Sequence, residues 1–589
     1  MASPATAAPF AYSPQDIRPI TRRHGRGDNQ VDRHLQEPAD IVMRSPTLIH
    51  RTFLALVVAV AGLSIPSPSP AAAAGIPVQR FGGVDRYATA AIVSANHFAP
   101  GVPAVYVATG ANFPDALAGG PAAARNGAPI LLVTRGEIPG ATKNELTRLR
   151  PGRIVVLGGT GVISDGVASA LAAYQTGGGV RRIAGADRFA TAAAVSAATF
   201  APGTPTAYVA TGANFPDALV GGAAAARSGS PVLLTNPGSV PASTEAELRR
   251  LAPGKIVVLG GTGVVSDTVV ARLRTLATSG TVVRHAGADR YATAIAVSRA
   301  TVAPGAAGLF VATGRSFPDA LVAVPAAAKI GAALLLVPGD SVPGAIRTEA
   351  ARIAPARLGL LGGTGVLTER VTFDLRVAIG DLPPLPTCAY QDVLTKFRTY
   401  ADWQRTLVDT IYMVGSNYHP GDLVDTSSAG LNGGYATRKH VVADLKAMTD
   451  AARAAGRPIQ VVSGFRSYAT QQTTFNYWVS VGGYEHALRT SARAGHSEHQ
   501  LGTTFDFTSL GGRPPWEYSD WAALPAGAWM AANAWRYGFV MSYPKGAFGK
   551  VCYDYEPWHY RYVGRDAAAA VRSSGLTLRE WLWMKGSGA

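Results

Sequence analysis

A unit of 102 residues occurs three times in this chain, and the register does not slip between copies. The same three motifs recur in the same order: GGVDRYATA (82–90), AGADRFATA (184–192) and AGADRYATA (286–294); TGANFPDAL (109–117 and 211–219) and TGRSFPDAL (313–321); VVLGGTGV (155–162 and 257–264) and GLLGGTGV (359–366). Self-similarity at a fixed period indicates a structural array. About 100 residues can bury a core of their own, so each copy is predicted to be a small domain.

Each copy alternates short apolar runs with Ala-rich stretches. In the first copy the runs end at Gly110, Val133 and Gly159. Such runs are typical of buried parallel strands, and the Ala-rich stretches between them are typical of helices. The alternation predicts three tandem α/β units with parallel sheets, at 79–180, 181–282 and 283–380. The GGTG segment lacks the Lys-Ser/Thr of a phosphate-binding loop, so we interpret its glycines as a tight strand-to-helix turn.

Positive charge is concentrated in the repeats. Residues 75–380 hold 27 Lys and Arg against 16 Asp and Glu, a net charge of +11, whereas residues 381–589 hold 20 against 17, a net of +3. A basic array attracts polyanions. The repeats contain no run of Lys and Arg and little aromatic interleaving, so nucleic acid is not the expected partner. An anionic cell-wall polymer fits better, and a solvated basic surface without a partner is the alternative.

The recurring DRYATA, FPDAL and LGG segments resemble the type 2 cell-wall-binding repeat of Gram-positive surface proteins. The resemblance covers about residues 79–379 and implies a three-fold packing that holds an anionic wall polymer near the clefts between units. It makes Arg86, Arg188 and Arg290 the candidate polymer contacts, each beside an Asp. From the residues alone, these Asp-Arg pairs are equally well explained as structural groups that cap the start of a helix.

An export signal precedes the repeats. Residues 53–64 are apolar over about twelve positions, too few for a bilayer span, which needs about twenty. Arg44 and Arg51 come before them and PSPAAAAG follows, which predicts a secretory signal at 43–74. We interpret residues 1–42 as disordered or as a misassigned start. No later stretch is long and apolar enough to span a membrane, so the expected location is the cell wall or cell surface.

The composition changes sharply after the Pro-rich segment 381–387, which favours an extended spacer. Residues 388–589 lose the repeat and the Ala/Gly bias, and they are long enough for one α+β domain. Both cysteines, Cys388 and Cys552, lie there. In an oxidising compartment they are expected to form a disulfide. The alternative is that Cys552 binds a metal.

Four residues near the C-terminus point to hydrolysis: His499, Asp506, Glu556 and His559. Two imidazoles and one carboxylate are a common ligand set for a catalytic zinc, with one coordination position left open for water. A second carboxylate can take the proton from that water. Glu498, next to the first His, is interpreted as a solvated charge.

These strings resemble the VanY-type D-alanyl-D-alanine carboxypeptidases, a zinc metallopeptidase family. Its S-x-H-x-x-G-x-A-x-D pattern appears as SEHQLGTTFD (497–506), its E-x-W-H pattern as EPWH (556–559), and its S-G-[YF]-R-S-x-x-x-Q segment as SGFRSYATQ (463–471). One departure is Thr504, where the family usually has Ala; this small residue is expected to be tolerated near the metal, with a change in the pocket wall.

The resemblance implies a role for each matched residue. His499, Asp506 and His559 bind Zn²⁺, and Glu556 is the general base. Arg466 faces the scissile carbonyl or the substrate carboxylate, and a fixed cation there stabilises developing negative charge. The resemblance also makes Ser497 and Gln471 substrate-binding or positioning groups.

Together these features predict an exported, wall-anchored zinc peptidase that removes the terminal D-Ala from peptidoglycan stem peptides. Two alternatives stay open. One is an endopeptidase of the same zinc family that cuts another stem or cross-bridge bond. The other is a non-catalytic wall-binding surface or adhesion protein.

Overall fold

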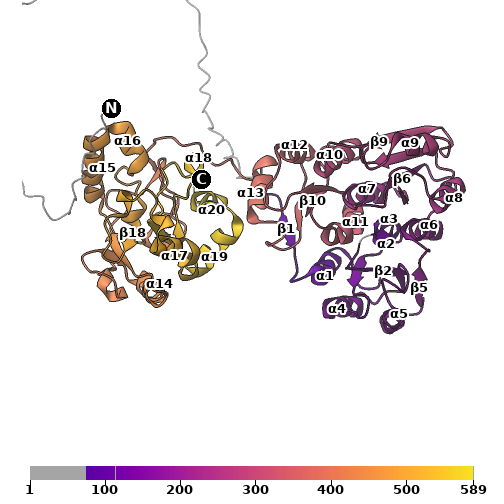
Figure 1. Cartoon of the computed structure of the whole chain (residues 1–589), viewed down its shortest axis with the longest axis horizontal. Coiled ribbons are helices and arrows are strands. Elements are labelled where there is room, and N and C mark those ends of the chain that lie inside the picture. The colour runs from indigo at the N-terminus through magenta and orange to yellow at the C-terminus, as the bar shows by residue number, and fades with distance from the viewer. Residues whose placement is uncertain (1–74, 113, 588–589) are drawn as a thin grey trace, which may run out of the picture. The chain divides into compact units, whose positions relative to one another are not determined.

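The computed structural model describes residues 75–112 and 114–587 (Figure 1). The predicted signal segment at 43–74 and the preceding residues 1–42 lie outside this range. Each repeat contributes a four-stranded, fully parallel sheet, as expected. In the first two units the strands are, in sheet order, β3 (Ile130–Val133), β2 (Ala104–Thr109), β4 (Arg153–Leu157) and β5 (Val180–Ile183), then β7 (Val232–Thr235), β6 (Thr206–Thr211), β8 (Lys255–Leu259) and β9 (Thr281–His285).

The third sheet takes one strand from the beginning of the array. Its order is β11 (Ala332–Val337), β10 (Gly308–Thr313), β12 (Leu358–Leu361) and β1 (Val78–Phe81). β1 pairs in parallel with β12, so Val78 lies opposite Leu358. In the first two units the corresponding edge strand comes from the start of the next copy. The first strand of the array therefore completes its last unit.

Helices pack against the strands of each sheet. Equivalent helices of the three units are α1 (Arg86–His97), α6 (Arg188–Thr199) and α10 (Arg290–Thr301); α3 (Gly119–Arg125), α7 (Pro216–Arg227) and α11 (Pro318–Ile330); α4 (Gly140–Leu149), α8 (Ala242–Leu251) and α12 (Gly344–Ile353); α5 (Asp165–Leu171), α9 (Asp267–Arg274) and α13 (Glu369–Ala378). The short α2 (Pro114–Leu117) precedes α3. Helices α3, α7 and α11 each contact the other two. With the β1–β12 pairing, these contacts close the three units into a ring.

The C-terminal domain is built on an antiparallel sheet. Its order is β17 (Ile459–Ser463), β18 (Thr504–Ser509), β20 (His559–Tyr562) and β19 (Phe539–Met541). The surrounding helices are α14 (Val442–Ala454), α15 (Tyr468–Gly482), α16 (Tyr484–Thr490), α17 (Pro525–Asn533), α18 (Phe548–Val551), α19 (Arg565–Ser574) and α20 (Leu578–Met584). The predicted fold class, three α/β units followed by an α+β domain, is confirmed.

Side-chain alternation along β18 divides its residues between core and site. Phe505 and Phe507 are fully buried in the core of the domain, where their rings pack against Phe539. Successive residues of a strand point to opposite faces, so Asp506 is directed away from that core. This alternation directs the Asp506 carboxylate away from the two buried Phe side chains of the same strand.

The Pro-rich linker is packed rather than free. Leu382 is 7% exposed and joins a hydrophobic cluster with Phe373 of α13 and Leu582 of α20. The indole N–H of Trp583 donates to the carbonyl of Pro383 at 2.9 Å. The linker therefore follows the surface of α20 instead of standing away from it.

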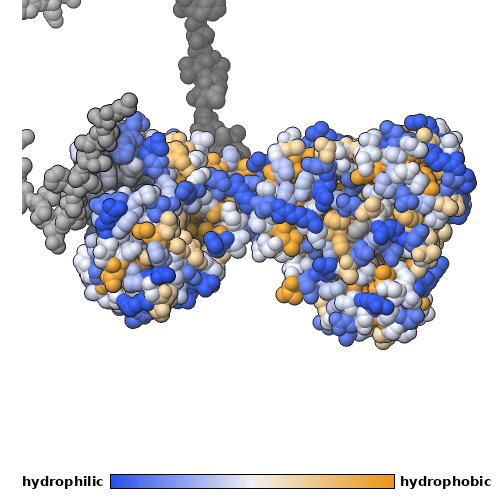
Figure 2. Space-filling model, viewed as in Figure 1, coloured by the Kyte–Doolittle hydropathy of each residue, from blue (hydrophilic) through white to orange (hydrophobic). Residues whose placement is uncertain are grey.

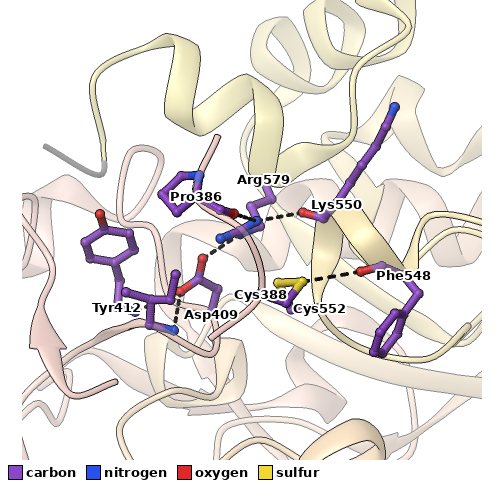
Figure 3. Close-up of a disulfide and its surroundings, with 9 residues drawn as sticks. Pro386, Cys388, Asp409, Tyr412, Phe548, Lys550, Cys552 and Arg579 are labelled. Carbon is purple, nitrogen blue, oxygen red and sulfur yellow. Dashed lines mark hydrogen bonds and ion pairs between the residues drawn. A yellow bond between two sulfur atoms is a disulfide. The ribbon is translucent and has the colours of Figure 1, made fainter. Parts of the chain in front are cut away.

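Cys388 and Cys552 form a disulfide across 164 residues (Figure 3). Arg579 lies beside it and donates to the carboxylate of Asp409 at 2.5 Å and to the carbonyls of Pro386 and Lys550. Two independent connections thus join the start of the domain to the segment that precedes Glu556.

The visible surface carries no broad apolar area. On the face shown in Figure 2, hydrophobic residues occur as small areas separated by hydrophilic ones. Within residues 75–112 and 114–587, no helix has both the length and the apolar character needed to cross a bilayer.

Candidate metal centre

Two neighbouring strands and one preceding turn bring His499, Asp506 and His559 together. In the antiparallel pairing of β18 with β20, Asp506 lies directly opposite His559. His499 comes from a short 3₁₀ helix, Glu498–Leu501, that leads into β18. All three side chains are buried, and one ligand atom from each lies within 4.8 Å of the others. This separation is compatible with coordination of a single ion.

The two imidazoles present opposite nitrogens to this point. His499 Nδ1 is hydrogen-bonded to the carbonyl of Gly464 at 2.7 Å, which requires the proton on Nδ1. Its buried Nε2 lies 3.2 Å from Asp506 Oδ2 and has no well-directed hydrogen-bond partner in the described chain. His559 Nδ1 lies 3.1 Å from Asp506 Oδ1. An unpartnered buried nitrogen beside a carboxylate and a second imidazole fits a zinc site with one open position.

The pKa values of the two histidines are shifted in opposite directions. Burial, together with the charge of Arg466, lowers the pKa of His499 to about 4. Burial also disfavours the charged form of His559, but its hydrogen bonds to Asp506 and Glu498 outweigh this and raise its pKa to about 10. His499 is therefore ready to bind a metal at neutral pH, whereas His559 must first lose a proton.

Glu556 lies at the edge of the cluster without joining the ligand set. Its Oε2 is 3.5 Å from His559 Nδ1, and its backbone N–H donates to the carbonyl of Tyr543. Burial raises its pKa to about 8. The side chain still keeps 17% exposure. A carboxyl group that titrates near neutrality and can reach solvent suits general acid–base chemistry.

Arg466 is held in place by two neighbours. Its Nε donates to Gln471 Oε1 at 2.8 Å and its Nη1 to Ser463 Oγ at 2.7 Å. The guanidinium lies 3.7 Å from Asp506 Oδ2 and remains 23% exposed. It is therefore a fixed cation at the mouth of the site, with surface left for a ligand.

The predicted substrate-binding residues are both buried. Gln471 accepts from Arg466, and its amide donates to the carbonyl of Ala492 at 2.7 Å. Ser497 Oγ accepts the backbone N–H of His499 at 3.3 Å. Substrate contact by either residue stays a prediction. In this structure both side chains make hydrogen bonds to neighbouring residues of the site, which stabilise its geometry.

One site residue was missed from the sequence. Glu498 was interpreted as a solvated charge, but its side chain is 5% exposed and its carboxylate contacts His559 Nε2 at 3.0 Å. Burial of this charge is tolerated because Arg561 and Ser542 supply hydrogen-bond partners for the carboxylate. Its position beside His499 was the only signal, and adjacency to a ligand does not reveal burial.

Family comparisons agree with this geometry. The model of cell wall binding domain 2 matches residues 80–168, 182–270 and 284–372. The model of D-alanyl-D-alanine carboxypeptidase, VanY, matches residues 435–565, which include every residue of the candidate metal centre. The chain carries three cell wall binding repeats and a VanY domain.

Curated relatives resemble one part of the chain or the other. The putative carboxypeptidase YodJ of Bacillus subtilis (strain 168) is 37% identical over 181 residues, covering 30% of this chain and 65% of the relative. The N-acetylmuramoyl-L-alanine amidase LytC of the same organism is 29% identical over 305 residues, covering 51% and 58%. The chain thus spans less than two thirds of the length of either.

A solved structure resembles more of the chain. Cwp6 from Clostridium difficile matches with a TM-score of 0.50 at 23% identity, covering 68% of this chain and 61% of that protein. At this identity the match supports the fold only.

One of the three candidate arginines, Arg188, lines a cleft between two repeats. A cavity of about 260 Å³ separates the first two repeats, lined by Asp115 of one and Arg188 and Thr191 of the next. Arg188 donates to the carbonyl of Gly212 at 2.6 Å, and Arg86 and Arg290 make the equivalent bonds. The neighbouring Asp187 caps helix α6, so the capping interpretation holds for the Asp of the pair. Polymer contact by the Arg residues stays a prediction.

The glycine turn of each repeat packs against the Asp of the FPDAL motif. Gly158 has φ +96°, and a Cβ there would lie 2.6 Å from Asp115 Oδ2. Gly260 repeats this approach toward Asp217. A side chain at either glycine would collide with a half-buried carboxylate, which explains the glycine without a phosphate ligand.

Proposed function

We propose that the chain is an exported zinc peptidase that removes the terminal D-Ala from peptidoglycan stem peptides and is retained on the wall by its repeats. The observation that carries the proposal is the buried His499–Asp506–His559 cluster, with Glu556 and Arg466 at its open side. The match of this segment to the VanY family supports the choice of substrate.

The ligand atoms would be His499 Nε2, His559 Nδ1 and an Asp506 oxygen. When bound, zinc polarises a carbonyl oxygen and makes water more acidic. Glu556 then accepts a proton as water adds to the scissile carbonyl carbon. The same carboxyl group gives that proton to the departing amine as the C–N bond breaks, so the base is regenerated in one turnover.

Arg466 stabilises the negative charge that develops on the carbonyl oxygen, or binds the C-terminal carboxylate of the peptide. Gln471 and Ser463 fix the guanidinium before substrate arrives. A preorganised cation of this kind typically contributes a few kcal/mol to transition-state binding. A free carboxylate next to the cleaved bond is what distinguishes a carboxypeptidase substrate from an internal peptide bond.

The experiment is release of D-Ala from a pentapeptide ending in D-Ala-D-Ala, by protein loaded with zinc. The Glu556→Gln variant is expected to retain zinc and to lose about 10²- to 10⁴-fold in kcat, the range typical of a removed general base. Glu485→Gln, an equivalent change at an exposed position of α16, is the control.

Mass spectrometry of muropeptides identifies the bond that is cut. A loss other than one alanine would replace the carboxypeptidase with the endopeptidase alternative. Wild-type protein that binds zinc but cleaves no muropeptide would overturn the enzymatic proposal. Wall retention is tested separately, by sedimentation of the chain with isolated walls before and after extraction of anionic polymers. Equal sedimentation in both cases would exclude an anionic polymer as the partner.

A further inference from the structure

The imidazole of His559 lies between two carboxylates, and only one belongs to the predicted ligand set. Nδ1 faces Asp506 Oδ1 at 3.1 Å, and Nε2 faces Glu498 Oε2 at 3.0 Å. A metal-binding imidazole binds the ion through an unprotonated ring nitrogen and carries its proton on the other nitrogen. A carboxylate at Nε2 accepts that proton's hydrogen bond, so Nδ1 is left for the metal.

Glu498 is itself rigidly held. Ser542 Oγ donates to its Oε2 at 2.5 Å, and Arg561 Nη1 donates to its Oε1 at 3.1 Å. The carboxylate therefore faces His559 with both oxygens occupied and little freedom to rotate.

Arg561 is also fixed from behind. Its side chain is fully buried, and Nη2 donates to the carbonyls of Trp403 and Thr406 at 2.8 and 2.7 Å. These hydrogen bonds fix the position of the guanidinium beside Glu498. A buried carboxylate that is paired with a buried guanidinium stays charged, and a charged acceptor makes the stronger hydrogen bond to an imidazole.

The two histidines are anchored in complementary ways. His499 is held through Nδ1 by the carbonyl of Gly464 and offers Nε2, whereas His559 is held through Nε2 by Glu498 and offers Nδ1. Partners of ligating histidines fix the ring orientation and the tautomer, and their loss typically costs 10- to 100-fold in metal affinity.

We infer that Glu498 is a positioning residue of the metal centre: it fixes His559 as an Nδ1 ligand, with Ser542 and Arg561 holding its carboxylate. The inference rests on the zinc of the proposed function. It extends that proposal, because Glu498 touches neither the substrate nor the ion. Since Glu498 precedes His499 directly, one short segment supplies one ligand and the anchor of another.

The primary test is zinc affinity, measured by competition with a chromophoric chelator. Glu498→Gln is expected to bind zinc about 10- to 100-fold more weakly than wild type. Glu485→Gln, which removes the same charge from the surface, is expected to match wild type. Because Glu498→Gln leaves Arg561 without its anion, Ser542→Ala is a milder second variant with an expected loss of about two- to tenfold. Equal affinity in wild type and both variants would overturn the inference.

Ring-nitrogen NMR of the zinc-loaded protein gives a readout that a merely structural role would not move. In wild type, His559 is expected to carry its proton on Nε2 and His499 on Nδ1. A proton on Nδ1 of His559 would contradict the inference. Wild type that binds zinc but releases no D-Ala would overturn the proposed activity and leave the Glu498 comparison intact, whereas wild type that binds no zinc would overturn both.

Discussion

Two adjacent glutamines of α15 have opposite environments, which allows a matched comparison of single residues. Gln471 is fully buried against Arg466, while Gln472 is exposed. Gln471→Leu removes the acceptor that orients the guanidinium, so kcat/KM for D-Ala release is expected to fall about 10- to 100-fold, equivalent to a few kcal/mol of lost transition-state binding. Zinc content is expected to stay constant. Gln472→Leu is the control, and equal activity of the two variants would show that Arg466 does not depend on Gln471.

His559 makes metal binding dependent on pH. Its pKa of about 10 lies above the ordinary 6.5, so in the zinc-free chain it is protonated through the neutral range. Zinc must displace that proton, and the apparent affinity is expected to rise about tenfold per pH unit between pH 6.5 and 9. Calorimetry in buffers of different ionisation enthalpy is expected to find about one proton released per zinc. An affinity that does not change with pH would contradict this assignment.

The raised pKa of His559 also makes the stability of the folded, zinc-free chain depend on pH. A histidine whose pKa is raised on folding stabilises the folded chain fully below pH 6.5, and this contribution is lost as the pH rises toward about 10. The zinc-free protein is therefore expected to melt at a lower temperature as the solution becomes alkaline. In the zinc-loaded protein the ion takes the place of the proton, so this decrease is not expected.

At the scale of elements, one arginine joins each edge strand to the start of the helix that follows the neighbouring strand. Arg80 of β1 donates to the carbonyl of Leu367 at 2.7 Å and pairs with Glu369 at 2.8 Å. Arg182 and Arg284 make corresponding ion pairs in the other two units. Of these three arginines, only Arg80 joins segments almost 290 residues apart, so its contacts support closure of the ring.

Arg80→Ala is expected to destabilise the repeats by about 1–3 kcal/mol, because it removes hydrogen bonds to a charged group. All nine tryptophans lie at or beyond position 403, so their fluorescence follows the VanY domain, whereas far-UV circular dichroism follows both parts. The dichroism transition in urea is expected to shift while the fluorescence transition stays in place. Gln79→Ala, an exposed change on the same strand, is the control; an equal effect of both would refute this role of Arg80.

Local sequence patterns predicted individual strands better than they predicted which strands and side chains pair with one another. The apolar runs ending at Gly110 and Val133 predicted β2 and β3. The pairing of β1 with β12 depends on a contact between distant segments that no local pattern encodes. Glu498 was missed for a related reason: its burial depends on Arg561 and Ser542, which lie 63 and 44 residues away.

At the scale of the whole molecule, most of the net positive charge and the candidate zinc site lie in different regions of the chain. The repeats hold a net charge of +11 and the region after them +3, yet the candidate zinc site and its base lie in that second region. Retention on the wall and hydrolysis should therefore respond to different substitutions. An anionic polymer would be held by long-range attraction, which salt screens, so retention is also expected to weaken as salt rises.

Arg188→Glu tests this separation. Reversing the charge in the cleft between the first two repeats is expected to weaken retention on isolated walls about tenfold, equivalent to about 1.4 kcal/mol, with a further loss when Arg86 and Arg290 are also replaced by Glu. Release of D-Ala from a soluble pentapeptide is expected to be unchanged. Arg181→Glu, at an exposed position of β5, makes the same change in net charge outside the cavity lining. Equal losses for Arg188→Glu and Arg181→Glu would mean that net charge alone holds the chain on the wall, whereas a polymer seated in the cleft predicts the larger loss for Arg188→Glu.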